Sequence, residues 1–257
     1  MKVDFHLHSS FSGDSDTPAE EVILAGIKQG LSVLCFTEHL DKDFVCDGLS
    51  FELDTEGYFK KLRSLQDAFK GKLDIRIGVE LGLQSYLSEF HRNYIKQYPF
   101  DFVIGSTHLV DGCDPYYPEF WKNRNADEGL RRYFALTLEN IKTFDDFDVY
   151  GHLDYMIRYV PTEPKIFHYN TYQEQVDENL KTIISNGKGI EVNTGGYKAG
   201  LGVPNPCPDV IRRYRELGGE IVTIGADAHF PEYVGFHFED AREILKDCGF
   251  RYFTVFK

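Results

Sequence analysis

The sequence predicts one α/β domain built as a closed barrel of parallel strands, and three observations lead to this expectation. The chain has 257 residues, which is close to the roughly 250 residues typical of such barrels. Short β-rich runs alternate with helical patterns along the chain, as expected for parallel strands joined by right-handed crossovers. Residues able to bind a metal follow nearly every predicted strand. We therefore expect residues 1–257 to form a single domain.

The first strand, predicted at residues 2–6, ends at the first of these candidate ligands, His6, and the second, His8, follows two residues later. Side chains of an extended chain alternate between faces, so in Phe5-His6-Leu7-His8 the two imidazoles point the same way and the apolar side chains point the other way. Two imidazoles on one face can bind one metal ion. An isolated His-x-His is more often an ordinary strand end, so the metal hypothesis depends on further ligands from other strands.

A helix is predicted after the polar loop that follows this strand. Thr17 is expected to cap it, Pro18 to take its first position and Glu20 to close a capping box. The helix should end near Gln29, because Gly30 is a typical C-terminal stop. The same alternation then continues along the chain. Further strands are predicted at 32–37, 75–79, 102–106, 149–151, 189–192 and 221–224, with a strand-like tail at 252–256. Further helices are predicted at 55–69, 88–97, 126–144, 172–185, 208–217 and 238–246.

Imidazoles and carboxylates recur at the ends of these strands. Six of the nine histidines belong to this set, which consists of His6, His8, His39, Glu80, His108, His152, Asp227 and His229. The carboxyl ends of parallel strands meet at one end of a barrel, so these side chains should converge. Burying them without a cation would leave polar groups unpaired at a cost of several kcal/mol. The sequence therefore predicts a multinuclear metal site. Imidazole and carboxylate ligands without thiolate suit Zn, Mn or Fe and do not choose between them.

Composition narrows the possible compartment and partners. The five cysteines, at positions 35, 46, 113, 207 and 248, form no Cys-x-x-Cys pair, which argues against a disulfide framework or a zinc ribbon and for a reducing compartment. We expect no cleavable leader, and no stretch approaches the roughly 18 apolar residues of a membrane span, so we expect a cytoplasmic protein. A net charge of −13 and the lack of a basic run argue against nucleic acid as a partner.

Six short segments together resemble the polymerase and histidinol phosphatase (PHP) superfamily over essentially the whole chain. They are Phe5-His6-Leu7-His8-Ser9-Ser10 with Asp14, Thr37-Glu38-His39, Gly78-Val79-Glu80, Gly105-Ser106-Thr107-His108, Gly151-His152-Leu153-Asp154 and Gly225-Ala226-Asp227-Ala228-His229. Within the superfamily, the chain length and the segments 108–112 and 152–158 are most similar to the histidinol-phosphate phosphatases. The resemblance implies a distorted (β/α)7 barrel that hydrolyses L-histidinol phosphate, a step of histidine biosynthesis.

The resemblance also implies three divalent metal ions and a metal-bridged hydroxide as nucleophile. Carried over position by position, the first ion would be held by His6, His8, Glu80 and Asp227. Glu80 would bridge to a second ion held by His108 and His152, and the third would be held by Asp14, His39 and His229. Some relatives have histidine where Asp14 stands, and Asp16 is a nearby competitor for that role. Asp227 or His229 is expected to pass a proton to the departing alkoxide.

Contacts to a phosphomonoester substrate are expected from the strand-end loops. Arg158 is the favoured phosphate contact, because a guanidinium can hold two phosphoryl oxygens at once, and Ser85 and Lys198 are further candidates. For Lys198, an ordinary solvated loop position is an equal alternative. An aromatic and acidic loop follows His108 and would either hold an imidazole ring and an ammonium group or merely pack onto the barrel. Its residues are Asp114, Tyr116, Tyr117, Glu119, Phe120 and Trp121.

Several residues and functions are expected to lie outside this chemistry. A metal site of this kind replaces a protein nucleophile, so Cys35, Ser9 and Ser10 are expected to pack or to form hydrogen bonds. The remaining histidines, at positions 91, 168 and 237, should be structural or exposed to solvent. Two other functions stay open: a phosphoesterase acting on nucleotides or oligonucleotide ends, and a metal-binding accessory module without turnover.

Overall fold

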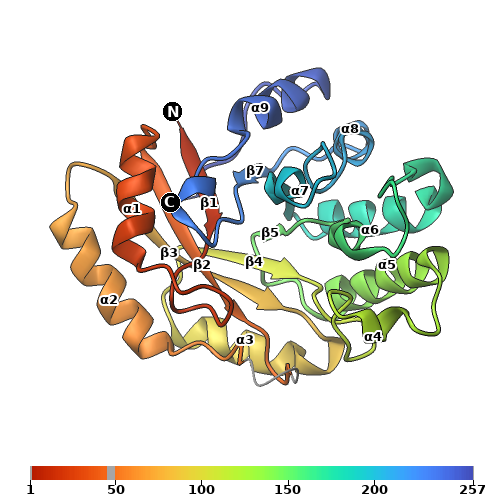
Figure 1. Cartoon of the computed structure of the whole chain (residues 1–257), viewed down its shortest axis with the longest axis horizontal. Coiled ribbons are helices and arrows are strands. Elements are labelled where there is room, and N and C mark those ends of the chain that lie inside the picture. Colours follow the sequence, from red (N-terminus) through yellow and green to blue (C-terminus); the bar gives the residue numbers. More distant parts are fainter. Residues whose placement is uncertain (1, 45–49, 257) are drawn as a thin grey trace.

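Seven parallel strands form one sheet in which each strand pairs with its neighbours in sequence. The computed structural model describes residues 2–44 and 50–256. The strands curl into a nearly closed barrel with the helices outside it (Figure 1). They are β1 (Val3–Leu7), β2 (Val33–Leu40), β3 (Asp74–Gly82), β4 (Phe102–Ser106), β5 (Val149–Tyr150), β6 (Gly189–Asn193) and β7 (Val222–Gly225). The predicted barrel of alternating strands and helices is thus confirmed.

Nine α-helices and four short 3-10 turns lie between or after these strands within the described part of the chain. The helices are α1 (Ala19–Lys28), α2 (Thr55–Ala68), α3 (Ser88–Gln97), α4 (Pro118–Trp121), α5 (Ala126–Thr143), α6 (Gln173–Ser185), α7 (Gly195–Lys198), α8 (Pro208–Glu216) and α9 (Phe238–Asp247). The turns are η1 (Ser85–Leu87), η2 (Tyr155–Tyr159), η3 (Tyr169–Thr171) and η4 (Pro231–Tyr233). None of the described helices has both the length and the apolar character needed to cross a membrane.

The barrel closes where β1 meets the end of β7. Backbone hydrogen bonds run from the amide of Asp227 to the carbonyl of His6 (2.8 Å) and from the amide of His8 to the carbonyl of Ala228 (2.9 Å). The buried carboxylate of Asp4 also accepts a hydrogen bond from the amide of Ala226 at 3.0 Å. Burial raises the pKa of Asp4 to about 7, although the hydrogen bonds that its carboxylate accepts from the amides of Ala226 and Gly235 favour its charged form. This seam fixes the two strand ends that carry four of the predicted ligands.

Two local predictions were wrong. Thr17 does not cap α1, whose N-cap is Pro18, because the Thr17 hydroxyl instead donates to the carbonyl of His229 at 2.8 Å. No capping box closes through Glu20, which pairs with Lys61. The tail forms no strand in the described residues, since its backbone pairing with β7 consists of one hydrogen bond, from the amide of Thr254 to the carbonyl of Val222.

The C-terminal segment instead packs into the barrel at the amino ends of the strands. Phe253, Val255 and Phe256 lie against a buried cluster that includes Phe5 and Phe102, and the rings of Phe102 and Phe256 are 5.0 Å apart. Apolar packing therefore fills one end of the barrel and leaves the carboxyl ends of the strands for polar chemistry.

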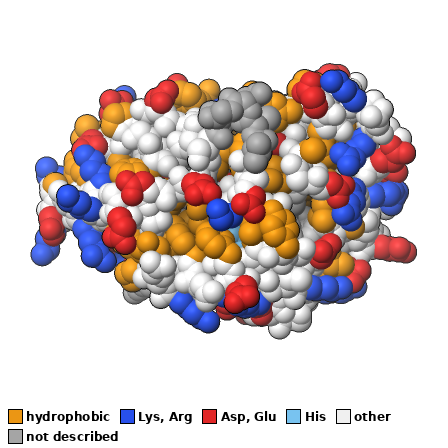
Figure 2. Space-filling model, turned by 90° about the horizontal axis from the view of Figure 1, so that it is seen from below, with side chains coloured by type: hydrophobic (Ala, Val, Ile, Leu, Met, Phe, Trp, Pro, Cys, Tyr) orange, Lys and Arg blue, Asp and Glu red, His pale blue; other side chains and the backbone are white. Residues whose placement is uncertain are grey.

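The cysteines form no disulfide within the described residues. Cys35, Cys113, Cys207 and Cys248 are free thiols, and Cys46 lies outside the part that the structure describes. Burial raises the pKa of the Cys35 thiol well above its usual value, which fits packing rather than reactivity. On the face shown in Figure 2, basic and acidic side chains alternate around hydrophobic ones in its middle.

Candidate metal centre

All nine predicted ligand residues come together at the carboxyl ends of the strands. Each has a ring nitrogen or carboxylate oxygen within 4.0 Å of another member of the set. They are His6, His8, Asp14, His39, Glu80, His108, His152, Asp227 and His229. Six strand ends contribute to this group, from β1 to β5 and β7. That these residues bind metal remains a prediction, but they lie close enough together to do so.

Glu80, on β3, lies fully buried at the centre of the group. One carboxylate oxygen, Oε2, is 3.0 Å from Nε2 of His6 and 3.1 Å from Nδ1 of His39. The other oxygen, Oε1, is 2.9 Å from Nε2 of His152 and 3.2 Å from Nε2 of His108. Burial opposes ionisation, but the surrounding imidazoles hold the pKa of Glu80 well below its usual value. The two oxygens therefore face two different groups of imidazoles, as a bridging ligand would.

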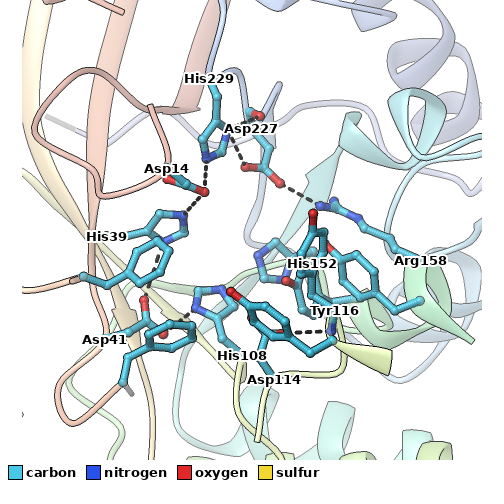
Figure 3. A pocket seen from close by; sticks show the side chains of 15 residues that line it. Asp14, His39, Asp41, His108, Asp114, Tyr116, His152, Arg158, Asp227 and His229 are labelled. Carbon is cyan, nitrogen blue, oxygen red and sulfur yellow. Dashed lines mark hydrogen bonds and ion pairs between the residues drawn. The ribbon is translucent and has the colours of Figure 1, made fainter. Parts of the chain in front are cut away.

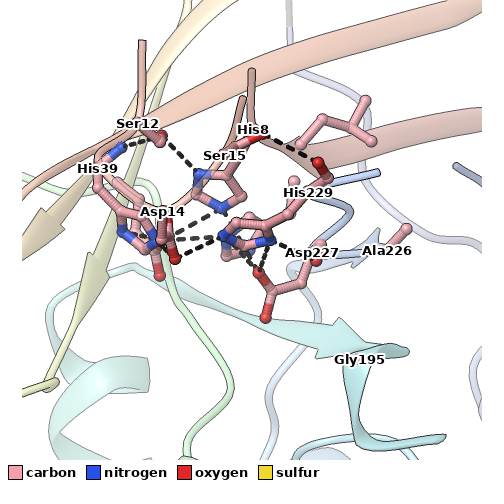
Figure 4. A network of polar contacts seen from close by, with 12 residues as sticks. His8, Ser12, Asp14, Ser15, His39, Gly195, Ala226, Asp227 and His229 are labelled. Atoms are coloured by element: carbon pink, nitrogen blue, oxygen red, sulfur yellow. Dashed lines mark hydrogen bonds and ion pairs between the residues drawn. The ribbon is translucent and has the colours of Figure 1, made fainter. Parts of the chain in front are cut away.

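Asp14, His39 and His229 form the more open part of the centre, beside His8 (Figure 4). The His8 ring stacks on the rings of His39 and His229, with centroids 4.2 Å apart in each case. Oδ2 of Asp14 is 3.0 Å from Nε2 of His229 and 3.7 Å from Nε2 of His39. Asp14 lines the pocket above this group, whereas the competing candidate Asp16 does not appear in its lining. The loop after β1 thus brings Asp14 to the position expected for it.

The donor geometry fits bound cations better than hydrogen bonding. Nε2 of His8, Nδ1 of His39 and Nε2 of His229 are buried, and none has a partner at hydrogen-bonding geometry among the described residues, although the last two lie close to carboxylate oxygens of Glu80 and Asp14. One nitrogen of each nevertheless lies within 4.8 Å of the other two. Burial and the neighbouring imidazoles of His229 and His39 keep the pKa of His8 well below its usual value, so this ring is neutral and can donate an electron pair to a metal.

A layer of acceptors behind the ligands fixes the orientation of their rings. Nδ1 of His6 is 2.6 Å from Oε1 of Glu191, and Nδ1 of His108 is 2.7 Å from Oδ1 of Asp41. Nδ1 of His8 is 3.0 Å from the Ser12 hydroxyl. Contacts of this kind leave Nε2 of each ring facing the centre. None of these three acceptors is predicted from the sequence, although Glu191 lies on β6 and Asp41 follows β2 directly.

Replacing Asp41 by asparagine is expected to weaken metal binding about 10- to 100-fold, because an amide cannot polarise Nδ1 of His108 as a carboxylate does. Competition with a chelator, followed by mass spectrometry for retained metal, measures this loss. Ser85→Ala is the control. The Ser85 hydroxyl donates to a carboxylate oxygen of Glu139 at 2.7 Å, and Ser85 does not line the pocket. Equal metal affinity in Asp41→Asn and the unaltered chain would show that Asp41 does not support His108.

Arg158, in the turn η2, is buried beside the centre and points toward Asp227 (Figure 3). Three acceptors hold its guanidinium. Its Nη1 donates to Oδ2 of Asp227 at 2.9 Å, its Nη2 to Oδ1 of Asn193 at 2.8 Å and its Nε to Oδ1 of Asn205 at 2.8 Å. These contacts use three of the five N–H groups of a guanidinium. Since Arg158 also lines the pocket, its remaining N–H groups are available to an anion there.

The pocket above the centre has a volume of about 310 Å³ and is largely aromatic. We define its aromatic mouth as Phe44, Phe51, Tyr116, Tyr117 and Tyr155, all of which line it. The Tyr155 ring packs on His152, with centroids 4.7 Å apart, and the Phe51 ring packs edge-on against His39 at 5.4 Å. Besides the predicted ligands Asp14 and Asp227, two further carboxylates, Asp41 and Asp114, line the pocket. Burial raises the pKa of Asp114.

The aromatic loop that follows His108 contributes both to the pocket wall and to packing. Tyr116 and Tyr117 line the pocket, whereas Phe120 is buried and the indole N–H of Trp121 donates to the carbonyl of Pro115.

Three predicted substrate contacts lie elsewhere. Ser85 is turned toward Glu139, so the structure does not place it in the pocket. Glu119 is exposed and pairs with Lys122 at 3.3 Å, because α4 points its side chain outward. Lys198 lines a second hollow beside the centre and is absent from the lining of the aromatic pocket.

The three remaining histidines lie away from the predicted ligands. His91 is fully buried against Phe144 and is therefore structural rather than exposed to solvent. His168 is the N-cap of η3. His237 is exposed and contacts Asp240.

Comparison with known proteins assigns the chain to a family. The model of the PHP domain family matches residues 4–195, about three quarters of the chain and six of the seven strands. The chain belongs to the PHP domain family. This PHP domain is 32% identical to a histidinol-phosphatase of Lactococcus lactis, over 99% of this chain and 94% of that protein. It is 33% identical to a protein of Clostridium acetobutylicum named probable histidinol-phosphatase, over 98% of this chain and 95% of that protein.

Solved structures agree with the sequence relatives of this PHP domain. The crystal structure of histidinol phosphate phosphatase from Lactococcus lactis, in complex with Zn, L-histidinol and phosphate, superposes with a TM-score of 0.91 at 32% identity. The match covers 100% of this chain and 97% of that one. A structure from Listeria monocytogenes, 20% identical with a TM-score of 0.78 over 93% of this chain and 99% of that chain, supports the fold alone.

Proposed function

We propose that this chain is a metal-dependent phosphomonoesterase that hydrolyses L-histidinol phosphate to L-histidinol and inorganic phosphate. The observation that carries the proposal is Glu80, whose two oxygens face two groups of imidazoles beside the buried guanidinium of Arg158. A histidinol phosphate phosphatase with 32% identity holds Zn, L-histidinol and phosphate. Histidine biosynthesis is the pathway in which this hydrolysis belongs.

Three groups of side chains are proposed to hold divalent ions. His6, His8, Glu80 and Asp227 would hold one, and Glu80 with His108 and His152 a second. Asp14, His39 and His229 would hold a third. When bound, divalent ions of this kind lower the pKa of a coordinated water and neutralise phosphoryl charge. Zn, Mn and Fe all suit these donors.

Side chains around the phosphoryl group are proposed to bind it and to move one proton. Arg158 would donate its free N–H groups to phosphoryl oxygens while it holds Asp227 in place. Hydrolysis adds water oxygen to phosphorus and breaks the bond from phosphorus to the alcohol oxygen, which must then take up a proton. Asp227 or His229 would deliver that proton, because both line the pocket beside Arg158.

The aromatic mouth and its carboxylates are proposed to bind the alcohol part of the substrate. L-Histidinol carries an imidazole ring and an ammonium group. Tyr117 and its aromatic neighbours offer ring faces, and Asp114 offers a carboxylate at the same pocket wall. Ser85 and Glu119 have no part in this proposal, because neither lines the pocket.

A phosphate-release assay tests the proposed function directly. We expect the metal-supplemented full chain to release phosphate from L-histidinol phosphate with a kcat/KM at least roughly 100-fold above that for nucleotides or short DNA. A chelator should abolish the activity, and re-addition of Zn, Mn or Fe should restore it, with metal content measured on the same sample. A preference for nucleotides or DNA ends would contradict the substrate. A fully metallated chain that hydrolyses none of these esters would favour a non-catalytic metal-binding module.

The charge distribution makes nucleotides and oligonucleotides the weaker alternative. The chain carries a net charge of −13, and on the face in Figure 2 basic side chains alternate with acidic ones. Nucleic acid binding normally rests on clustered Lys and Arg that neutralise several phosphates at once. A small phosphomonoester needs only the charges at the centre itself. These observations support a small-molecule substrate.

A further inference from the structure

Two hollows open from the same group of side chains at the metal centre. One is the pocket that ends in the aromatic mouth, and the other has a volume of about 330 Å³. They share five lining residues, which are Asp14, Arg158, Tyr159, Asp227 and His229. Only the second hollow, which we name the side chamber, is also lined by Gly195, Lys198, Ala199 and Phe230. The centre is therefore connected to two hollows rather than one.

Apart from the proposed metal ligands, the charged residues that line only one of the two hollows differ in sign. Asp41 and Asp114 line the pocket of the aromatic mouth but not the side chamber. Lys198 is the one ionisable residue that lines the side chamber and not the other hollow. An anion at the centre thus meets carboxylates in one direction and an ammonium group in the other.

Lys198 is held at the side chamber by aromatic rings. Its Nζ lies 5.0 Å from the centroid of Tyr233 and 5.6 Å from that of Phe230, within the range of cation–π contacts. Within residues 2–44 and 50–256, no carboxylate oxygen lies within the 4.0 Å ion-pair distance of Nζ. Arg158, the other basic residue lining the side chamber, is already paired with Asp227. Lys198 therefore presents an uncompensated positive charge next to the centre.

We propose that the side chamber binds the phosphate product and is its route to solvent, with Lys198 as the contact that draws it out. The proposal rests on the proposed function, which supplies the two products. Phosphate is an anion, so its passage toward Lys198 is favoured over passage between Asp41 and Asp114. The alcohol product carries an ammonium group and an aromatic ring, which match the acidic and aromatic residues of the other hollow. The two products thus leave by different openings.

Product inhibition in Lys198→Gln tests this separation. In the metal-loaded full chain, we expect the inhibition constant of inorganic phosphate to rise roughly two- to fivefold, as for loss of one exposed charge contact. The inhibition constant of L-histidinol should stay unchanged, with an aryl phosphate as reporter substrate. Calorimetric titration of inorganic phosphate should show the same two- to fivefold loss, and Lys198→Arg should restore binding. Lys122→Gln is the matched control, because it removes the same charge from α4, where Lys122 pairs with Glu119.

Several results would overturn the side chamber as the phosphate route. They are unchanged phosphate constants in Lys198→Gln, equal weakening of both products, or the same effect in Lys122→Gln. The calorimetric titration measures the binding of inorganic phosphate itself, so its result does not depend on which ester the chain cleaves. If Lys198→Gln weakens phosphate binding but the chain fails to hydrolyse L-histidinol phosphate, the proposed function fails and the side chamber stands. If the hydrolysis is normal and phosphate binding is unchanged, only the side chamber fails.

Discussion

Glu80→Gln is expected to lower kcat/KM about a thousandfold or more, because loss of a bridging carboxylate removes several kcal/mol of charge stabilisation. The Glu80 carboxylate contacts imidazoles through both oxygens, with Oε2 3.0 Å from His6 and Oε1 2.9 Å from His152. An amide has the same shape but no charge, and its NH2 group would face ring nitrogens that must bind metal. We expect the variant to lose at least one ion per chain, as measured by mass spectrometry beside phosphate release.

Glu89→Gln serves as the control for this variant. Glu89 lies exposed in the first turn of α3, so the same chemical change occurs there without contact to the centre. Circular dichroism should show both variants folded, since the packing around residue 80 is unchanged in volume. If Glu80→Gln kept full metal content and near-normal kcat/KM, the bridging role would be refuted. Equal losses in the two variants would also refute it.

The sequence predicts the barrel and the meeting of the ligands because both depend on patterns that are local in the chain. Alternating strands and helices imply parallel strands, and parallel strands bring their carboxyl ends together. Glu80 and His108 are 28 positions apart, yet each needs only its place at the end of its own strand to be recognised. The observed strands β2 and β3 run three residues beyond their predicted ends, so that His39 and Glu80 lie within strands rather than after them.

The supporting layer was not predicted because its contacts join distant segments. Glu191 contacts His6 across 185 positions, and Asp41 contacts His108 across 67, with nothing in either local pattern to pair them. The positions of Ser85 and Glu119 outside the pocket depend on the rotation of η1 and α4, which strand-end reasoning does not fix. The Thr17 hydroxyl likewise donates to the carbonyl of His229, which is distant in sequence, instead of capping the helix that follows it.

Replacing Arg158 should affect both stability and substrate binding, because the structure gives this side chain two tasks. In Arg158→Ala, Asp227 loses its buried partner at 2.9 Å and the acceptors of Asn193 and Asn205 lose their donors. Breaking a buried ion pair from one side costs about 3–5 kcal/mol, so the free energy of unfolding should fall by that amount in urea titrations. The KM for L-histidinol phosphate should rise strongly, while excess metal in the assay keeps the sites filled.

Two further variants separate these tasks. Arg158→Lys keeps a positive charge but cannot reach three acceptors in the plane of a guanidinium, so it should recover part of the stability and little of the KM. Asn205→Ala removes the acceptor of Nε at 2.8 Å and the donor to the Asp154 carboxylate at 2.6 Å, while the charge of the guanidinium stays. It should destabilise the fold by about 1–3 kcal/mol, because it leaves a buried donor unpaired, and leave the KM near that of the unaltered chain. If Arg158→Ala changed stability alone, the guanidinium would be a support for Asp227 and not a phosphate contact. If it changed the KM alone, the ion pair with Asp227 would contribute nothing to folding, and the phosphate contact would stand without it.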